Sequence, residues 1–345
     1  MNKYSHSFPS FDNSIAKTAY KAISTGQFSG RDIKKKAERQ FSKFVNSSQS
    51  IITGSGFSAL QSALVASGLN NKTEVIIPTI TCPSVYHAIL SVGAKPVITD
   101  VGRDLPLFTT ETSNSVFNNK NKVVIVPQMF GLLQDLKPYA KKGFFVIEDA
   151  AQLLRPDTDK DADISIFSFS PTKLMTVGYA GVLVSNDSDL IRKVKIFLDC
   201  DYKIHCDRTL ENNISFRINS SISDFQCNML IEQLKRYNKV IEYRKALILE
   251  YDKQLGFPDR LYNDVPFRYL LKITSENASE IAACLNNANI GAVPLGSHLL
   301  HRLFHIDGNF DNAERWYNSL LSLPLNESIG IDDVKIICNK VKKYL

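Results

Sequence analysis

Seven short runs rich in β-branched residues alternate, in the first part of this chain, with segments whose apolar residues recur every three or four positions. The runs are SIITG, EVIIP, KPVITDV, KVVIVPQ, FFVIEDA, SIFSFS and GVLVSND. Buried strands separated by amphipathic helices are typical of a mostly parallel sheet covered on both faces. Ligands of such sheets bind beyond the carboxyl ends of the strands, where GSGFSA, EDAAQ and SFSPTK stand. We therefore expect an α/β fold with a seven-stranded sheet and a ligand site at one edge.

A change of pattern near residue 220 divides the chain. One long helical pattern, SDFQCNMLIEQLKRYNKVIEYRKALILEYDKQL, is followed by a predicted strand, RYLLKI, and a predicted helix, ASEIAACLNNANI. The last helix is expected to begin near Asp332, because aspartates stand at its start and lysines at its end, as the helix dipole favours. We therefore predict a large domain over residues 1–234, including the N-terminal segment, and a smaller C-terminal α/β domain over residues 235–345.

The charge of the chain is modest and evenly spread. Lys and Arg number 41 against 35 Asp and Glu, which gives a formal net charge of +6. The densest basic cluster, RDIKKKAERQ at residues 31–40, is typical of a solvated helix face, so we expect no nucleic-acid partner. The most apolar long window, VIIPTITCPSVYHAILSVGA, contains two prolines and a histidine, and strand, loop and helix explain it better than a membrane span. The N-terminus lacks a signal-peptide pattern, and we expect a cytoplasmic protein.

The cysteines are six in number and irregularly placed, which fits a reduced cytoplasmic protein. Cys200 and Cys206 flank His205, an arrangement that could hold a metal ion. Structural zinc sites use four ligands, commonly with paired cysteines at CxxC spacing, and the sequence offers no second pair. We expect no metal site.

A glycine-rich turn, TGSGFSA, stands between the first predicted strand and a helix. Gly54, Ser55, Gly56 and Ser58 would surround the free N–H groups of the first helical turn, which attract anions. Many such turns are glycine-rich for steric reasons only, and that alternative stays open. The turn has neither the GKS/T ending of a P-loop nor a full GxGxxG motif.

Two charged residues follow later strands. Asp149 ends the run FFVIED, and a carboxylate there needs either a cationic ligand group or a role as a helix cap. Lys173, in SFSPTK, is either a surface charge or an amine in an apolar pocket. In such a pocket, loss of hydration would lower its pKa and make it a nucleophile toward aldehydes.

The three features together match the needs of pyridoxal phosphate. That cofactor requires an anion site for its phosphate, an acidic partner for its pyridinium nitrogen and an amine for its aldehyde. The glycine-rich turn, Asp149 and Lys173 supply one each. The same lysine, once released from the cofactor, would move the proton between cofactor and substrate carbon.

The sequence also resembles the DegT/DnrJ/EryC1/StrS family of pyridoxal-phosphate-dependent sugar aminotransferases. The resemblance covers nearly the whole chain, and EDAAQ followed by FSFSPTK is its most specific part. It also runs through ISTGQFSG, SGFSALQSAL, EVIIPTITC, GAKPVITDV, SISDFQCNMLIEQL and SLLSLPLN. The resemblance implies the fold type I architecture of aspartate aminotransferase and a homodimer with two shared active sites.

The resemblance also implies a role for individual residues. Lys173 would be the amine that condenses with the cofactor, Asp149 would pair with the ring nitrogen, and Gln152 would lie near the ring hydroxyl. Ser168, together with the backbone of Gly56 and Phe57, would hold the phosphate. Asn219, in RINSSISDFQ, would reach the phosphate of the neighbouring subunit.

Several residues depart from the family pattern. Phe57 replaces the threonine whose hydroxyl usually touches the phosphate, and Ser58 is a candidate to compensate. Cys82 stands where an aromatic side chain commonly stacks on the cofactor ring, and gives a thinner, polarizable cover. Ser221 and Gln128 replace an arginine and a histidine of the family. These changes affect the expected substrate more than the expected cofactor.

Our leading hypothesis is transfer of an amino group from an amino acid, glutamate, to a keto-sugar that the resemblance implies is nucleotide-linked. The product would serve polysaccharide or secondary-metabolite synthesis. An alternative is a paralogue that binds the cofactor without catalysis. Sugar 3-dehydratases carry histidine in place of Lys173, and a dehydrogenase would need a dinucleotide fingerprint that GSGFSA does not supply. His298 and His301, in GSHLLHRLF, fit one face of a helix or an approach to the substrate.

Overall fold

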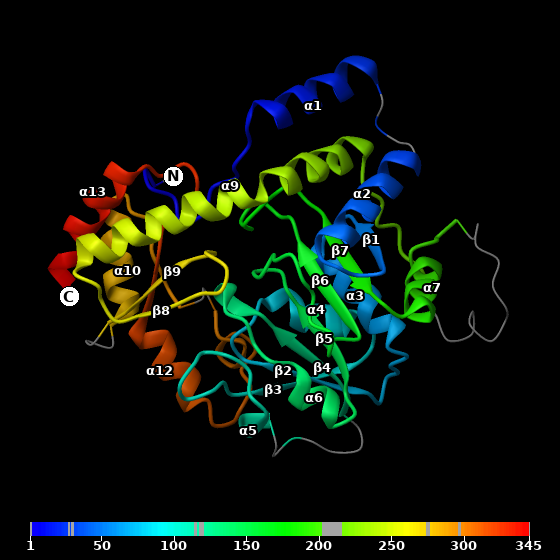
Figure 1. Ribbon diagram of the computed structural model, residues 1–345. Helices are drawn as coiled ribbons and strands as arrows, with labels where there is room; N and C mark the ends of the chain where they lie inside the picture. Colours follow the sequence, from blue (N-terminus) through cyan, green and yellow to red (C-terminus); the bar gives the residue numbers. More distant parts are fainter. Residues whose placement is uncertain are drawn as a thin grey trace.

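A seven-stranded sheet forms the centre of the larger part of the molecule (Figure 1). The computed structural model describes residues 2–26, 28, 31–113, 116, 121–201, 216–273, 277–295 and 298–344. The strands are β1 (Gln49–Thr53), β2 (Glu74–Pro78), β3 (Lys95–Thr99), β4 (Asn121–Pro127), β5 (Phe145–Asp149), β6 (Ile164–Ser168) and β7 (Gly181–Ser185). Each overlaps one of the seven predicted runs, although β1, β4 and β6 begin one residue before theirs, and this confirms the α/β fold with a seven-stranded sheet.

The strand order is β1-β7-β6-β5-β4-β2-β3. Strand β7 is antiparallel to both of its neighbours, β1 and β6, whereas the other pairs are parallel. The sheet is therefore mostly parallel, as predicted, and the carboxyl ends of six strands meet the amino end of β7 at one edge.

Alternating apolar side chains on the strands bury both faces of the sheet. Ile51, Ile166 and Leu183 belong to the core beneath α3 (Gly56–Ala66), α4 (Pro83–Ser91) and α7 (Ser188–Phe197). Ile52, Phe167 and Val182 point the opposite way, into the core formed with α2 (Arg31–Phe44) and α9 (Asp224–Leu255). On that same face, near the other end of the sheet, Tyr139 of α6 (Lys137–Lys141) packs in a core with Phe108, which precedes α5 (Thr110–Ser113). Side chains of successive strand residues alternate between faces, so this pattern fixes the register.

Helix α9 is one continuous element of 32 residues. It begins with a capping box in which the Ser223 hydroxyl and the Gln226 side chain satisfy each other's backbone N–H groups, and it ends at Gly256 with φ of 72°. The predicted domain boundary at residues 234 and 235 falls inside this helix. The helix packs against α1 (Asn13–Thr25) and α2 at one end and against α13 (Ile331–Val341) at the other.

A second sheet of four strands, in the order β10-β11-β9-β8, lies under the C-terminal half of α9 (Figure 1). Leu247 and Tyr251 of α9 share a core with Leu271 of the sheet and Ile337 of α13. The strands are β8 (Arg260–Leu261), β9 (Tyr269–Lys272), β10 (Val293–Pro294) and β11 (Leu320–Leu323), and the remaining helices are α10 (Ala278–Asn287), α11 (Leu300–Leu303) and α12 (Asp311–Ser319), with short 3₁₀ turns at Met129–Gly131 and Lys342–Tyr344.

The N-terminal segment connects the two sheets. Tyr4 forms a parallel bridge with Ile290, at the edge of the smaller sheet. Further along, the carbonyl of Ser10 accepts hydrogen bonds from Gln233 (3.1 Å) and Arg236 (3.2 Å) of α9. Residues 5–9 therefore pass along the boundary between the two sheets.

Among the described residues, none of the helices combines the length and the apolar character that a membrane crossing requires. Within the same residues, no group of three His, Cys, Asp or Glu side chains is placed to hold a metal ion. His205 and Cys206, which raised the question of a metal beside Cys200, lie outside them.

Candidate active site

The three loops singled out in the sequence meet at one edge of the large sheet. The glycine-rich turn follows β1, Asp149 is the last residue of β5, and Ser168 is the last residue of β6. Because β7 runs antiparallel, its first residue, Gly181, lies at the same edge and pairs with Thr53 of β1. The fold thus brings together segments more than a hundred residues apart, as the parallel-sheet prediction required.

Helix α3 presents its N-terminus to this edge. Its N-cap residue, Ser55, accepts a hydrogen bond from the backbone N–H of Ser58 (3.1 Å), and the two hydroxyls are 3.0 Å apart. The N–H groups of Gly56 and Phe57 belong to the first helical turn, which has no intrahelical acceptors. Ser58 is therefore part of the cap, and Gly56 and Phe57 carry the amides available to an anion.

Two glycines make this turn possible. A Cβ on Gly56 would lie 3.0 Å from both Cβ and Oγ of Ser168, so glycine lets the Ser168 hydroxyl come alongside the helix N-terminus. A Cβ on Gly181 would lie 2.1 Å from the carbonyl oxygen of Ser55, which no side chain can tolerate. The close approach of β6, β7 and the turn places the Ser168 hydroxyl beside the N–H groups at the start of α3, and such a set of donors suits a phosphate.

Asp149 is buried, with 7% of its surface exposed. It accepts one hydrogen bond from the backbone N–H of Ala151 (3.1 Å). Burial raises the pKa of Asp149, while the charge of Lys173 and the Ala151 hydrogen bond oppose that rise. Within the described residues no cation lies within 4.0 Å of this carboxylate. A cationic ligand group would therefore find a desolvated partner here.

Lys173 lies in the loop between β6 and β7. The loop is folded on itself: the Thr176 hydroxyl donates to the Phe169 carbonyl (3.0 Å), and the Lys173 N–H donates to the Ser170 carbonyl (3.1 Å). Gln233 of α9 donates to the Thr176 carbonyl (2.8 Å) and holds the loop from behind. Burial lowers the pKa of Lys173, although the charges of Asp149 and Cys82 act in the opposite direction.

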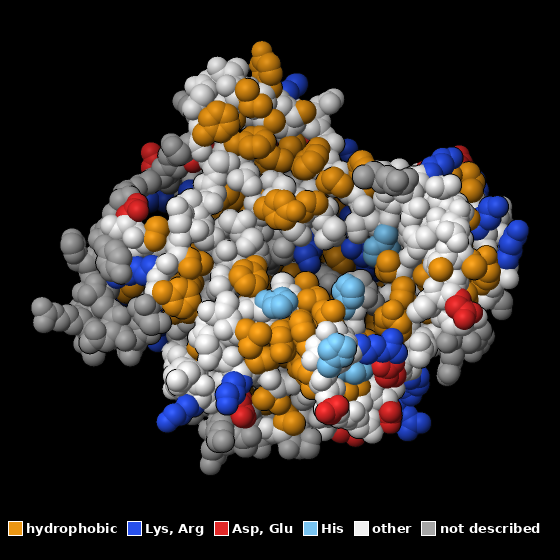
Figure 2. Space-filling view, turned by 180° about the vertical axis from the view of Figure 1, so that it is seen from behind, with side chains coloured by type: hydrophobic (Ala, Val, Ile, Leu, Met, Phe, Trp, Pro, Cys, Tyr) orange, Lys and Arg blue, Asp and Glu red, His pale blue; other side chains and the backbone are white. Residues whose placement is uncertain are grey.

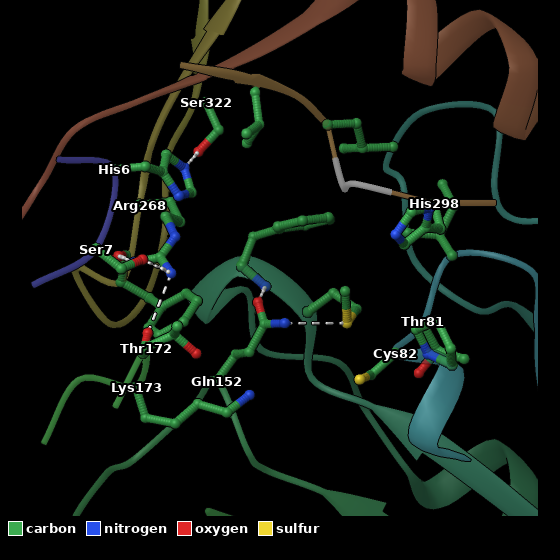
Figure 3. Close-up of a pocket in the computed structure, with 17 residues that line it drawn as sticks. His6, Ser7, Thr81, Cys82, Gln152, Thr172, Lys173, Arg268, His298 and Ser322 are labelled. Atoms are coloured by element: carbon green, nitrogen blue, oxygen red, sulfur yellow. Dashed lines mark hydrogen bonds between the residues drawn. The ribbon is translucent and has the colours of Figure 1, made fainter. Parts of the chain in front are cut away.

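A cavity of about 290 Å³ opens above Lys173 (Figure 3). His6, Ser7 and Arg268 line one side, Thr81, Cys82 and His298 line the opposite side, and Gln152 lies between them. The cavity thus contains Lys173, Gln152 and Cys82 from the predicted set of site residues.

The side chain of Gln152 is fixed within the cavity. Its carbonyl oxygen accepts from the backbone N–H of Phe130 (2.8 Å), and its amide nitrogen lies 3.6 Å from the sulfur of Met129. Cys82 is exposed and is the N-cap residue of α4, where its sulfur accepts from the Ser84 hydroxyl at 3.0 Å. Both side chains line the same cavity as Lys173.

Gln128 has a structural partner instead of facing the cavity. Its side chain donates to the buried carboxylate of Glu148 (3.1 Å), which also accepts from the Ser165 hydroxyl (2.5 Å). The backbone N–H of Gln128 donates to the Asp149 carbonyl (2.9 Å). Gln128 therefore supports the strand that carries Asp149.

Asn219 lies apart from the cavity of its own chain. Its side chain is exposed, and its oxygen accepts from the backbone N–H (3.1 Å) and the hydroxyl (2.7 Å) of Ser221. The adjacent Ser220 accepts from the Gly54 N–H through its carbonyl (3.1 Å) and its hydroxyl (2.9 Å). The contribution of Asn219 to a neighbouring subunit stays a prediction.

The two histidines of GSHLLHRLF differ. His298 lines the cavity, whereas His301 stacks on Phe310 and contacts Glu314 (2.9 Å) and Thr79 (2.8 Å). His301 is thus held by packing within α11 and α12.

His6, Ser7 and Arg268 are among the cavity residues that the sequence did not predict. They come from the N-terminal segment and from the residue before β9, and neither segment carries a recognisable motif. The only sequence signal is an arginine directly before a buried strand, which by itself predicts no site.

Comparison with known proteins agrees with this architecture. The fold is that of an aminotransferase: TlmJ from Streptoalloteichus hindustanus superposes with a TM-score of 0.88 at 18% identity, over 99% of this chain and 98% of that one. The model of the DegT/DnrJ/EryC1/StrS aminotransferase family matches residues 9–342, and the chain belongs to this family.

Two curated relatives show the range of activities among similar proteins. GDP-perosamine synthase of Vibrio cholerae is 24% identical, over 97% of this chain and 97% of its own. The 3-oxo-glucose-6-phosphate:glutamate aminotransferase of Bacillus subtilis (strain 168) is 24% identical, over 92% of this chain and 77% of its own.

Proposed function

We propose that this protein is a pyridoxal-phosphate-dependent aminotransferase that moves an amino group from glutamate to a keto-sugar. The observation that carries the proposal is the placement of Lys173 and Asp149 beyond neighbouring strands at one edge of the sheet. The lysine is an amine whose pKa burial lowers, and it lines a cavity. The carboxylate is buried, and no cation lies within 4.0 Å of it among the described residues.

The residues fit the cofactor on structural grounds. Because Gly56 has no Cβ, the Ser168 hydroxyl lies beside the N–H groups at the N-terminus of α3, and these donors together suit a phosphate. Asp149 offers the desolvated acid that a pyridinium nitrogen needs, and Lys173 offers the amine. When bound, pyridoxal phosphate supplies an aldehyde that takes up the amino group and a ring that accepts the electron pair of the reacting carbon.

The protein side chains then have distinct tasks. Gly56, Phe57 and Ser168 would hold the phosphate, and Asp149 would favour the protonated form of the ring nitrogen. Lys173 would act as base and then as acid at its Nζ: it would take the proton from the α-carbon of the donor and give it to the carbon of the cofactor's former aldehyde group. A lowered pKa suits this task, because the base must be unprotonated near neutral pH.

The names of the relatives support the choice of substrates. GDP-perosamine synthase is named for a nucleotide-linked amino sugar, and the Bacillus relative for a keto-sugar phosphate and glutamate. We therefore propose a phosphorylated keto-sugar, with nucleotide linkage as the first case to test, and glutamate as donor. The product would be an amino sugar for polysaccharide or secondary-metabolite synthesis.

A homodimer with shared active sites is part of the proposal. Apolar side chains gather at the top of the molecule, over α1 (Figure 2). Tyr20 and Ile23 of α1 are 75% and 67% exposed, and Tyr179, close to the lysine loop, is 63% exposed. Contiguous exposed apolar side chains are typical of subunit contacts. A partner on this surface would lie beside Tyr179, in the loop between β6 and β7 that also carries Lys173.

The test combines a spectrum with a substitution. Pyridoxal phosphate added to the purified protein should give an absorbance band that glutamate bleaches, and Lys173→Ala should lose both the band and all turnover. Gln233→Ala is the matched control, because it changes the support of the loop while leaving the amine. A Lys173→Ala variant that still transaminates would overturn the proposal. A wild-type band that no amino acid changes would favour a cofactor-binding paralogue without catalysis.

A further inference from the structure

Phe130 has an unusual backbone conformation at the wall of the cavity. Its φ of 63° and ψ of 11° lie in the left-handed region, which residues with a Cβ rarely adopt. In the described part of the chain, the other non-glycine residues with positive φ are all exposed: Asn46, Phe257, Asn289 and His305. Phe130 is only 4% exposed and lines the cavity. Such a conformation persists only where the surrounding contacts hold it, which makes those contacts of interest.

Two side chains hold the backbone of Phe130. Its N–H donates to the Oε1 atom of Gln152 (2.8 Å), and its carbonyl accepts from the Nδ2 atom of Asn263 (2.6 Å). Gln152 follows β5 of the large sheet, whereas Asn263 lies between β8 and β9 of the smaller sheet. Phe130 is therefore held from both sides, with one hydrogen bond to each part of the molecule.

The residues next to Phe130 bring the same two segments into close contact. The carbonyl of Gly131 accepts from the N–H of Val265 (2.9 Å), and a Cβ on Gly131 would lie 2.1 Å from the Val265 carbonyl oxygen. The N–H of Leu133 donates to the carboxylate of Asp264 (2.7 Å). The segment that contains Asn263 is thus docked on the turn that contains Phe130.

The orientation of the Asn263 amide follows from its partners. Its Nδ2 donates to two carbonyls, those of Phe130 (2.6 Å) and Arg268 (2.9 Å), so an oxygen in this position would face two acceptors. Its Oδ1 is buried and has no hydrogen-bond partner among the described residues. Because a buried polar atom without a partner is unfavourable, asparagine at this position is explained by its two N–H groups.

The bond to Phe130 also fixes which end of the Gln152 amide is free. Because Oε1 accepts from the Phe130 N–H, Nε2 has only a weak acceptor, the sulfur of Met129 at 3.6 Å. Gln152 lines the cavity, and Figure 3 shows its amide above the side chain of Lys173. The N–H groups of Nε2 are therefore available to an acceptor on a ligand bound at Lys173.

We propose that Asn263 is a positioning residue for the cofactor. It holds Phe130 in the left-handed conformation, the Phe130 N–H then fixes the Gln152 amide, and that amide donates to an oxygen atom on the cofactor ring. The inference rests on the proposed function for the identity of the ligand. It adds a residue from the smaller sheet that acts on the cofactor without touching it.

The test is a pH titration of the absorbance band that pyridoxal phosphate gives with the purified protein. Asn263→Asp keeps the size of the side chain but replaces the donor with an oxygen that faces two carbonyls. If the Gln152 amide then turns away, the ring oxygen loses a donor and holds its proton more tightly. The midpoint of the titration should therefore rise by about 0.5–1 pH unit. Affinity for pyridoxal phosphate should fall by about 3- to 10-fold.

Two further variants locate the effect. Gln152→Ala should raise the midpoint by a similar amount. Adding Asn263→Asp to Gln152→Ala should change the midpoint by less than about 0.2 unit, because both substitutions act through the same amide. Asn263→Ala removes the two hydrogen bonds without adding repulsion, and it supplies the test if Asn263→Asp does not fold.

Asn286→Asp is the matched control. The Nδ2 of Asn286 also donates to two carbonyls, those of Ala282 (2.7 Å) and Ala292 (2.6 Å), but Asn286 does not line the cavity. This variant should lose melting temperature to an extent comparable with Asn263→Asp, while its titration midpoint stays that of the wild type.

Three outcomes would overturn the inference. A lower melting temperature with an unchanged midpoint in the Asn263 variants would show that Asn263 only joins the two segments. A midpoint that Gln152→Ala leaves unchanged would show that this amide does not act on the ring. A full additional shift on combining Asn263→Asp with Gln152→Ala would show that Asn263 acts by another route. If the wild-type protein gives no absorbance band with pyridoxal phosphate, the proposed function itself fails, and the inference fails with it.

Discussion

Replacement of Gly56 by alanine tests the phosphate site through a single carbon atom. The added Cβ would lie 3.0 Å from both Cβ and Oγ of Ser168. Carbon atoms in contact prefer separations of about 3.5–4.0 Å, so the helix N-terminus and Ser168 must separate by roughly 0.5–1 Å. That movement takes the Ser168 hydroxyl and at least one amide of α3 beyond ordinary hydrogen-bond distance from a shared anion.

The magnitude follows from the bonds lost. A hydrogen bond to a charged group contributes about 1.5–3 kcal/mol, so losing one or two should weaken cofactor binding by about 3 kcal/mol, or roughly 150-fold. The fold itself should not suffer equally. Gly56 is the first residue of a helix and its φ is not positive, and alanine favours the helical state by up to about 1 kcal/mol over glycine. Gly56→Ala should therefore weaken cofactor binding without a matching loss of stability.

The assay is a titration of cofactor-free protein with pyridoxal phosphate, followed by absorbance, with thermal melting measured on the same samples. Gly330→Ala is the matched control: it also changes a glycine at a helix N-terminus, but its Cβ would meet only Asp333 at 3.5 Å, an ordinary contact. Cofactor affinity in Gly56→Ala within a factor of about 3 of wild type would refute the assignment of the phosphate to this turn.

Two further predictions concern the site and its support. Asp149→Asn should lower the pKa of Lys173 further, because the carboxylate charge in the wild type favours the ammonium form. Cofactor capture needs the unprotonated amine, so as the pH is lowered the capture rate of the variant should begin to drop at a lower pH than that of the wild type. An unchanged pH profile would mean that the two side chains do not interact. Gly181→Ala should destabilise the fold by about 1–3 kcal/mol or more, because its Cβ would overlap the Ser55 carbonyl at 2.1 Å, and a melting temperature equal to that of wild type would contradict this packing.

The sequence predicted the central sheet well because each strand carries its own signal. A short apolar run such as EVIIP, when helices flank it, fits few structures other than a strand buried on both faces. The positions of Asp149 and Lys173 followed, since parallel strands align their carboxyl ends whatever the details of packing. The predicted domain boundary at residues 234 and 235 falls inside α9. No sequence signal marks a boundary there, because the apolar periodicity of this helix continues without interruption from one sheet to the other.

The wall formed by His6, Ser7 and Arg268 could not be predicted in the same way. Ser7 and Arg268 are joined by one hydrogen bond across 261 positions of sequence, and nothing local announces such a contact. Among the described residues, the buried Arg244 and Arg260 each pair with a carboxylate, whereas Arg268 does not. Absence of a partner is a property of the folded chain.

The continuous helix α9 restricts how substrates enter. Its 32 residues form a rod of about 48 Å that is anchored by α1 and α2 at one end and by α13 at the other. A hinge between the sheets would have to break this rod, which contains no proline or glycine to bend at. We expect both sheets to keep a fixed separation during turnover, so that substrate exchange depends on side-chain rearrangement at the mouth of the cavity.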